Sequence, residues 1–250
     1  EMLAFLLALL ATVDAATLLV SHNGKDAAGC GTPAAPCATI DFATASSLQN
    51  DIIELEQSTV PYTCPATTVR IDNRTISSTG AAISCSSPSP VVTHFICSSY
   101  STCAFAGVSL RGVAFKFTDV SVALFVRCAL TANARVEASW ARLGQPGSLL
   151  FHASLIAGNR PATHVVSVSN AGARVSLDLR NCTVRDNAQP SRNLSTVLEL
   201  HTTASSANAI TLTIDRCVFA RNAFQRSVVT AIGSSGDVGK HRCYSSGRPG

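Results

Sequence analysis

The sequence has few charged and few aromatic side chains. Asp, Glu, Lys and Arg make up 14% of the 250 residues, against roughly 25% in average soluble proteins, and Phe, Trp and Tyr make up 6%. The 19 basic and 15 acidic residues leave a net charge of +4, and the basic residues are scattered singly. Nucleic-acid binding needs clustered positive charge, so we expect no nucleic-acid partner.

Short motifs for metal and nucleophile chemistry are also missing. The sequence contains no Cys-x-x-Cys pair, no His-Glu-x-x-His and no Gly-x-Ser-x-Gly. Zinc sites and hydrolases with a nucleophile elbow depend on such spacings, because they bring ligands or nucleophile and base together. We therefore expect no metal and no cofactor.

No apolar run is long enough to span a membrane. The longest candidate, Leu3 to Val13, is shorter than the roughly 20 residues that a membrane helix needs. It ends in small residues, with Val13 and Ala15 suitably placed before a cleavage point, so residues 1–16 are predicted to be a signal peptide. The chain starts with Glu1 before a Met and has no basic residue ahead of the run, so the start of the peptide is expected to be trimmed. The alternative is a buried first strand or capping helix.

The ten cysteines of the sequence also favour export from the cell. Without metal spacing, so many cysteines are typical of an oxidising compartment. We expect a protein that is secreted or on the cell surface. Three Asn-x-Ser/Thr acceptors, at Asn73, Asn181 and Asn193, would then be glycosylation sites. Asn73 and Asn193 are preferred, because Asn181 lies inside a repeated unit.

The sequence does contain a repeated unit. "RNCTVRDN" at 180–187 is closely matched by "DRCVFARN" at 215–222, and more loosely by "CALTAN" at 128–133 and "SLIAGN" at 154–159. Each unit follows a run in which apolar and polar residues alternate, which is the pattern of a β-strand. The unit is therefore a strand, a short corner, an apolar pair and an Asn.

The spacing of this unit predicts a β-solenoid. Its anchors are 26, 28 and 35 residues apart, and periods of roughly 20–50 residues are typical of stacked repeats. We expect the anchors to form an inward ladder: Cys128, Ser154, Cys182 and Cys217. We expect the turn residues to stack and hydrogen-bond along the solenoid: Asn133, Asn159, Asn187 and Asn222.

The order of several weak motifs adds a family resemblance. "VSHNGKDAAGCGTPAAPCATIDFA" at 20–43 is followed by "DIIELEQSTVPYTC" at 51–64, "AAISCSS" at 81–87 and "LRGVAFKF" at 110–117. Together with the repeated units, this order resembles secreted right-handed parallel β-helix proteins of the pectin-lyase-like superfamily, and polymorphic outer-membrane-type repeats. The usual Gly before the Tyr of the second motif is replaced here. The likeness covers about residues 17–230.

The resemblance implies an all-β fold, a right-handed parallel β-helix (β-solenoid) with a short N-terminal capping helix within 40–48. The helix domain is expected over 17–235, and 236–250 is expected to be a disordered tail or a truncation point. Local disulfides are expected for three pairs: Cys30–Cys37, Cys64–Cys85 and Cys97–Cys103. A Cys182–Cys217 bond is geometrically open because neighbouring rungs lie about 4.8 Å apart, and Cys243 has no evident partner.

Many proteins that share this resemblance cleave acidic polysaccharides with Ca²⁺ and an Arg base, or with paired Asp residues. Aligning the rungs on the anchors puts Val126, His152, Arg180 and Asp215 in one outward column, with Asp178 and Thr213 beside it. Each column has only one carboxylate, which does not match the paired acids of the hydrolases.

We therefore expect a non-catalytic extracellular protein that binds glycans or surface proteins, or acts as a rigid adhesin-like module. The alternative is a polysaccharide lyase or glycoside hydrolase acting on acidic polysaccharide, with Asp178, Arg180, Asp215 and His152 as its candidate residues. An exposed aromatic platform would favour glycan binding. Tyr62, Trp140 and Phe151 are the aromatics to examine, although Phe151 is expected in the core.

Overall fold

The computed structural model describes residues 15–65, 67–85, 93–132, 134–141, 145–159, 164–171, 173–187, 196–202, 210–222 and 229–233. Most of the predicted signal peptide and all of the predicted tail lie outside these residues, as do Asn133, Asn193 and Cys243. Within them the chain forms three parallel sheets and one short α-helix.

The three sheets run side by side along one axis. The first contains β1 (Thr17–Val20), β2 (Ile52–Leu55), β5 (Arg74–Ser78), β8 (Thr102–Ala106), β11 (Val122–Val126), β14 (Gly147–His152), β17 (Val175–Arg180) and β20 (Ile210–Asp215). The second contains β4 (Val69–Arg70), β7 (Phe95–Ser98), β10 (Ala114–Thr118), β13 (Arg135–Trp140), β16 (His164–Asn170), β19 (Thr196–Thr202) and β22 (Val229–Gly233). The third contains β3 (Tyr62–Thr63), β6 (Ala82–Ser84), β9 (Ser109–Arg111), β12 (Ala129–Thr131), β15 (Leu155–Ala157), β18 (Thr183–Arg185) and β21 (Val218–Ala220).

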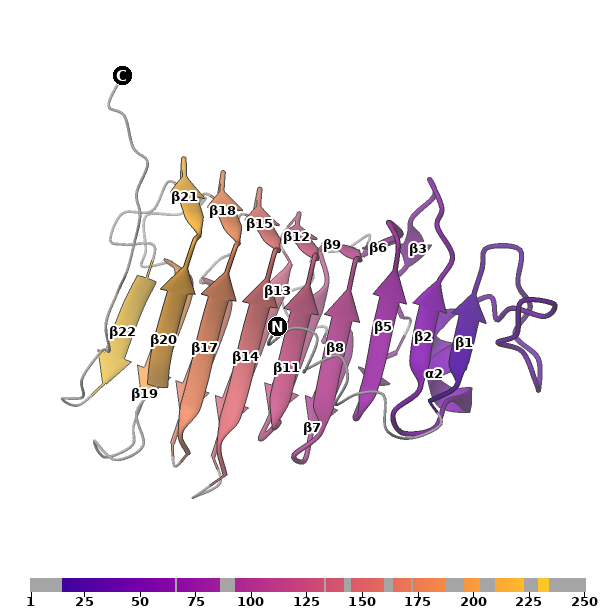
Figure 1. Ribbon diagram of the computed structural model, residues 1–250, viewed down its shortest axis with the longest axis horizontal. Helices are drawn as coiled ribbons and strands as arrows, with labels where there is room; N and C mark the ends of the chain where they lie inside the picture. Colours follow the sequence, from indigo (N-terminus) through magenta and orange to yellow (C-terminus); the bar gives the residue numbers. More distant parts are fainter. Residues whose placement is uncertain are drawn as a thin grey trace.

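From β7 onward, each coil contributes one strand to each sheet and pairs in parallel with the coil before it. In Figure 1 the first sheet faces the viewer with its strands pointing up, the chain crosses at the top through the third sheet, and it returns behind through the second. Because the coil also advances from right to left, it is right-handed, as parallel crossovers almost always are. The predicted parallel β-helix is confirmed.

Alternating residues build the interior of the coil. Phe105, Phe125 and Phe151 occupy one register of the first sheet, and their rings stack with centroids 5.4 and 4.9 Å apart. Phe115 of the second sheet meets this stack edge-on, 4.9 Å from Phe105. Tyr62, Trp140 and Phe151 are all buried, so none of the three aromatics singled out from the sequence forms an exposed platform.

The anchor residues form the expected ladder and are buried. Each donates its thiol or hydroxyl hydrogen to a carbonyl of the preceding coil: Cys128 to Phe105 at 3.3 Å, Ser154 to Phe125 at 3.2 Å, Cys182 to Phe151 at 3.3 Å and Cys217 to Leu179 at 3.3 Å. Burial raises the pKa of the Cys128 thiol to about 12, which describes an inert structural thiol. In the structure Cys182 and Cys217 are free.

The Asn residues form a second ladder. The Asn159 side chain donates to Asn187 Oδ1 at 3.0 Å, and the Asn187 side chain donates to Asn222 Oδ1 at 2.9 Å. The left-handed backbone lies one residue earlier, at Gly158, Asp186 and Arg221. Left-handed backbone therefore does not explain the Asn residues at these turns, whereas the predicted hydrogen bonds along the stack do.

The N-terminal end is covered mainly by a loop. The predicted helix exists as α2 (Ile40–Ser46), with Thr39 as its N-cap, but the free edge of β1 is hydrogen-bonded by the loop that follows β1 and leads to α2. Leu19 N–H donates to Gly31 O at 2.7 Å, and Cys37 N–H donates to Leu19 O at 2.9 Å. The loop therefore extends the sheet edge, and a capping role for α2 stays a prediction.

The three expected disulfides are present. Cys30–Cys37 closes the loop over β1, Cys64–Cys85 joins neighbouring coils with Cα atoms 4.9 Å apart, and Cys97–Cys103 closes the turn between β7 and β8. All three lie in the first half of the chain. They constrain coils in which short strands and long turns leave fewer ladder hydrogen bonds.

Candidate functional site

The outward column predicted from the sequence is present on the first sheet. The register places Val126 beside His152, His152 beside Arg180, and Arg180 beside Asp215. Asp215 forms an ion pair with Arg216 on its own coil, with Nε and Oδ2 3.2 Å apart. The four residues of the column therefore do lie side by side. Asp215, however, is already paired with Arg216, which lies outside the predicted column.

Asp178 occupies the adjoining column, opposite Thr213. Asp178 and Asp215 therefore lie on neighbouring strands, two residues apart along the strand direction. Strand spacing and rise put their Cα atoms about 8 Å apart. Each column thus holds one carboxylate, as predicted, and the register makes the two carboxylates diagonal neighbours.

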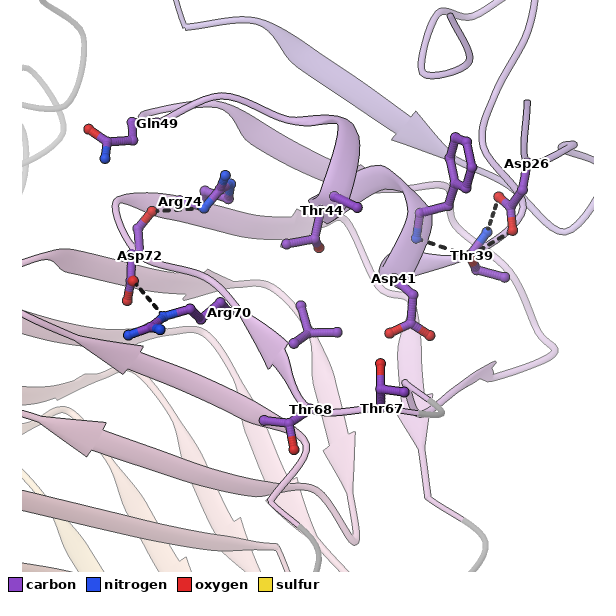
Figure 2. A pocket seen from close by; sticks show the side chains of 13 residues that line it. Asp26, Thr39, Asp41, Thr44, Gln49, Thr67, Thr68, Arg70, Asp72 and Arg74 are labelled. Atoms are coloured by element: carbon purple, nitrogen blue, oxygen red, sulfur yellow. Dashed lines mark hydrogen bonds and ion pairs between the residues drawn. The ribbon is translucent and has the colours of Figure 1, made fainter. Parts of the chain in front are cut away.

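A polar hollow lies elsewhere, between α2 and the start of the second sheet (Figure 2). This cleft has a volume of about 780 Å³. Most of its lining residues are of polar type: Asp26, Thr39, Asp41, Phe42, Thr44, Ala45, Gln49, Thr67, Thr68, Val69, Arg70, Asp72 and Arg74. It combines hydroxyls, carboxylates and guanidinium groups on one concave surface.

Hydrogen bonds fix the charged side chains of the cleft. Arg70 Nε lies 3.0 Å from Asp72 Oδ2, and Arg70 Nη2 donates to Ser98 Oγ at 2.6 Å. Asp72 Oδ1 also accepts the Ser98 backbone N–H at 2.7 Å. Arg74 donates to Ser47 Oγ at 2.6 Å and to the Asp72 carbonyl at 3.1 Å. These groups are held in place before any ligand arrives, while the Arg70 side chain stays 66% exposed.

The opposite wall is fixed by the helix cap. Asp26 accepts the backbone N–H groups of Ala38 and Thr39 at 2.8 and 3.0 Å and the Thr39 hydroxyl at 2.8 Å. Thr39 in turn accepts the Phe42 N–H as the N-cap of α2. The loop that covers β1 is thereby tied to the helix that lines the cleft.

A second hollow continues from the cleft across β7 and β10. Its volume is about 570 Å³, and it shares Thr68 and Arg70 with the cleft. The remaining lining residues are Ile96, Ser98, Ser99, Lys116, Thr118 and Asp119. We call the two hollows together the polar groove.

Further along the same sheet, three strands bring together a charged cluster. His164 Nδ1 lies 2.9 Å from Glu199 Oε2, and His164 Nε2 lies 3.8 Å from Glu137 Oε1. Arg135 Nη2 lies 3.1 Å from Glu137 Oε1. Burial lowers the pKa of His164, and nearby Arg135 also lowers it, whereas Glu199 and Glu137 act in the opposite direction. The imidazole is therefore mainly neutral at pH 7.

Two groups of potential metal ligands occur in the described residues: Cys64 with Cys85 and His94, and Asp72 with Cys97 and Cys103. In both, the sulfur atoms are joined in a disulfide. His94 Nδ1 accepts the Ala114 N–H at 3.0 Å, so in the neutral ring Nε2 carries the proton and is not a ligand. As they stand, these groups do not fit a metal.

Sequence reasoning missed the polar groove and the charged cluster. The residues of the groove come from five separate segments and those of the cluster from three strands, and these segments share no sequence motif. The short strands β4 and β7 carry no anchor residue. The only sequence signal for the groove and the cluster was the alternation of apolar and polar residues in "AFKFT" of β10 and "RVEASW" of β13, which places Lys116 and Glu137 on the outer face.

Comparison with known proteins finds no family model, no curated protein and no solved structure that matches the chain. Among the described residues, no helix is both long and apolar enough to cross a membrane.

Proposed function

We propose that the protein is a non-catalytic β-helix module that works outside the cell and binds a glycan chain in the polar groove. The observation that carries the proposal is the continuity of the two hollows through Thr68 and Arg70. A sugar chain presents hydroxyl donors and acceptors at short intervals. Fixed hydroxyl, carboxylate and guanidinium groups can exchange hydrogen bonds with them, directly or through water.

Cysteine chemistry supports the extracellular part of this proposal. Three disulfides in a chain of this size fit an oxidising compartment. The order of sequence motifs, together with the parallel coil, supports membership of the pectin-lyase-like superfamily, and the signal peptide over 1–16 belongs to the same proposal. Surface proteins remain the second kind of ligand, since a rigid polar face also suits protein recognition.

Glycosylation of this module is proposed at the acceptor sites. Asn181 is exposed at a corner with left-handed backbone, so its side-chain amide is open to modification. The Oδ1 atom of Asn73 accepts the Thr102 N–H at 2.8 Å, which ties this side chain into the fold. Asn181 is therefore the better acceptor of the two.

The fixed geometry of the groove supports binding over catalysis. General acid catalysis needs a carboxyl group poised to give up a proton. Asp72 instead is held by the Arg70 guanidinium through one carboxylate oxygen and by a backbone N–H through the other, so both oxygens are already engaged. Asp26 accepts three hydrogen bonds and is occupied in the same way.

A hydrolase acting on acidic polysaccharide is the alternative function. The observation in its favour is the register, which makes Asp178 and Asp215 diagonal neighbours on β17 and β20, since glycosidases act through a pair of carboxyl groups. Arg180 and His152, in register with Asp215, would contact the sugar acid. The Arg216 ion pair of Asp215 opposes this role.

The test incubates the full chain with immobilised neutral glycans and polyuronates, with and without Ca²⁺, and measures both retained protein and released reducing or unsaturated ends. We expect retention without products, and at least about tenfold weaker retention for Arg70→Ala. Lys25→Ala, which removes an exposed cation outside the groove, is the matched control. Retention unaffected by Arg70→Ala would exclude the groove, and products lost in Asp178→Asn would establish the hydrolase instead.

A further inference from the structure

The outer face of the second sheet carries an ordered column of side chains. In-register pairing from β4 to β19 aligns six residues: Arg70, Ile96, Lys116, Glu137, Ser167 and Glu199. The column is basic over β4 to β10 and acidic over β13 to β19. A second column beside it consists of hydroxyls: Ser98, Thr118, Ser139 and Ser169.

The charge order along this face is self-complementary. Reversing the order of the six strands places Lys116 opposite Glu137, and Arg70 opposite Glu199. The same reversal places Ser98 opposite Ser169, and Thr118 opposite Ser139. A two-fold axis that lies between two facing sheets, parallel to the strands, performs this reversal and leaves each column facing its own copy.

We infer that the outer face of the second sheet is a homotypic docking surface, on which two copies of this chain pack about a two-fold axis running between β10 and β13. The inference goes beyond the proposed function, because its partner is a second copy and no glycan is needed. Lys116 and Glu137 lie nearest the axis, so their contact occurs twice in each dimer. Such reciprocal charge contacts set register and speed association.

The ion pairs within one copy do not remove the charge complementarity between two facing copies. Lys116 is exposed and has no ion-pair partner among the described residues. Arg70 is tied to Asp72, but its guanidinium remains largely open. On the acidic half, Glu137 pairs with Arg135, and Glu199 faces the mainly neutral His164. In the dimer, the unpaired Lys116 of one copy therefore faces the acidic half of the other copy, which carries surplus negative charge.

The size of the face predicts the strength of the dimer. Six strands about 4.8 Å apart and about five residues long cover roughly 400 Å² per partner. The total of roughly 800 Å² is below the 1,200–2,000 Å² of stable complexes. We therefore expect a weak, reversible dimer with a Kd of roughly 10 μM or weaker that dissociates at about 0.5 M salt.

The test uses the full chain without glycan, by sedimentation equilibrium at low salt. Lys116→Glu and Glu137→Lys each place like charges together on the axis, so each alone is expected to weaken the dimer at least about tenfold. Mixing the two variants restores both contacts. The carboxylate introduced in one copy then faces the ammonium introduced in the other, and the second contact again joins the original Lys116 and Glu137.

The control variant is Lys25→Glu, which gives the charge change of Lys116→Glu away from the face. It is expected to dimerise like the unmodified chain. Circular dichroism confirms that each variant is folded.

Recovery of dimers in the mixture establishes the surface and its two-fold arrangement. A monomer at all concentrations in low salt overturns the inference, as does a mixture that associates no better than either variant alone. Glycan binding is measured separately on dilute monomer, so its failure leaves this result intact. If both hold, a glycan covering Arg70 is expected to compete with dimerisation.

Discussion

At the scale of single residues, two ladders hold neighbouring coils together. The anchor ladder uses small side chains that give one hydrogen to a carbonyl, so Cys and Ser are interchangeable there. The Asn ladder is more demanding, because each amide must donate along the stack and accept a backbone N–H from the preceding coil. Only an amide satisfies both requirements at one position.

Asn187 is the centre of this ladder and is fully buried. Its side chain donates to the Ile156 carbonyl at 2.9 Å and to Asn222, and it accepts from Asn159. Asn187→Ala leaves several buried groups unpaired, so we expect the free energy of unfolding to fall by about 2–4 kcal/mol. Urea denaturation followed by circular dichroism measures the change.

Asn187→Asp is expected to be at least as harmful, because a carboxylate supplies no donor for the Ile156 carbonyl. The exposed Asn23 provides the control, since its replacement by Ala should leave the urea midpoint unchanged. Equal midpoints for Asn187→Ala and the unmodified chain would show that the ladder contributes nothing to stability.

At the scale of elements, β13, β16 and β19 are linked across their outer face by His164. The groups facing it are Glu137 and Arg135 from β13 and Glu199 from β19. Because burial lowers the pKa of His164 in the folded protein, the unfolded chain binds more protons once the pH falls below its ordinary pKa of about 6.5. The stabilising contribution is therefore complete above about pH 6.5 and is lost as the pH falls below it.

We expect the melting temperature to decrease between pH 7.5 and pH 5.5, and to decrease less in His164→Gln. His94, whose pKa burial also lowers, remains in both proteins and accounts for part of the residual slope. Melting curves at several pH values for the two proteins give the comparison. A steeper acid destabilisation in His164→Gln would mean that the imidazolium gains more from the two carboxylates than burial costs it.

The arrangement of the strands and the helix also explains which features could be predicted from the sequence. The coils from β11 to β21 repeat a short sequence motif. Their anchor residues and the outward column of His152, Arg180 and Asp215 could therefore be aligned from the sequence. The polar groove could not, since it needs α2, β4 and β5 brought together by pairing partners that share no motif. Similarly, the Arg216 ion pair depends on a side-chain direction at a corner, which alternation does not encode.

At the scale of the whole molecule, the two halves of the coil are stabilised differently. All three disulfides lie between Cys30 and Cys103, whereas the described coils after that point rely on stacked side chains and the two ladders. In a solenoid each coil contacts only its neighbours, so a local loss of stability need not spread along the axis. The ends can therefore open independently.

Reduction tests this independence. Each disulfide contributes about 2–4 kcal/mol, so reducing all three should open the coils of β1 to β8 and leave those of β11 to β20 closed. Hydrogen exchange followed by mass spectrometry, with and without a phosphine reductant, reports protection for each strand. We expect protection to fall in the described strands from β1 to β8 and to persist in those from β11 to β20. A uniform loss would mean that the coil unfolds as one cooperative unit, and that the free thiol ladder and Phe stack cannot hold the second half alone.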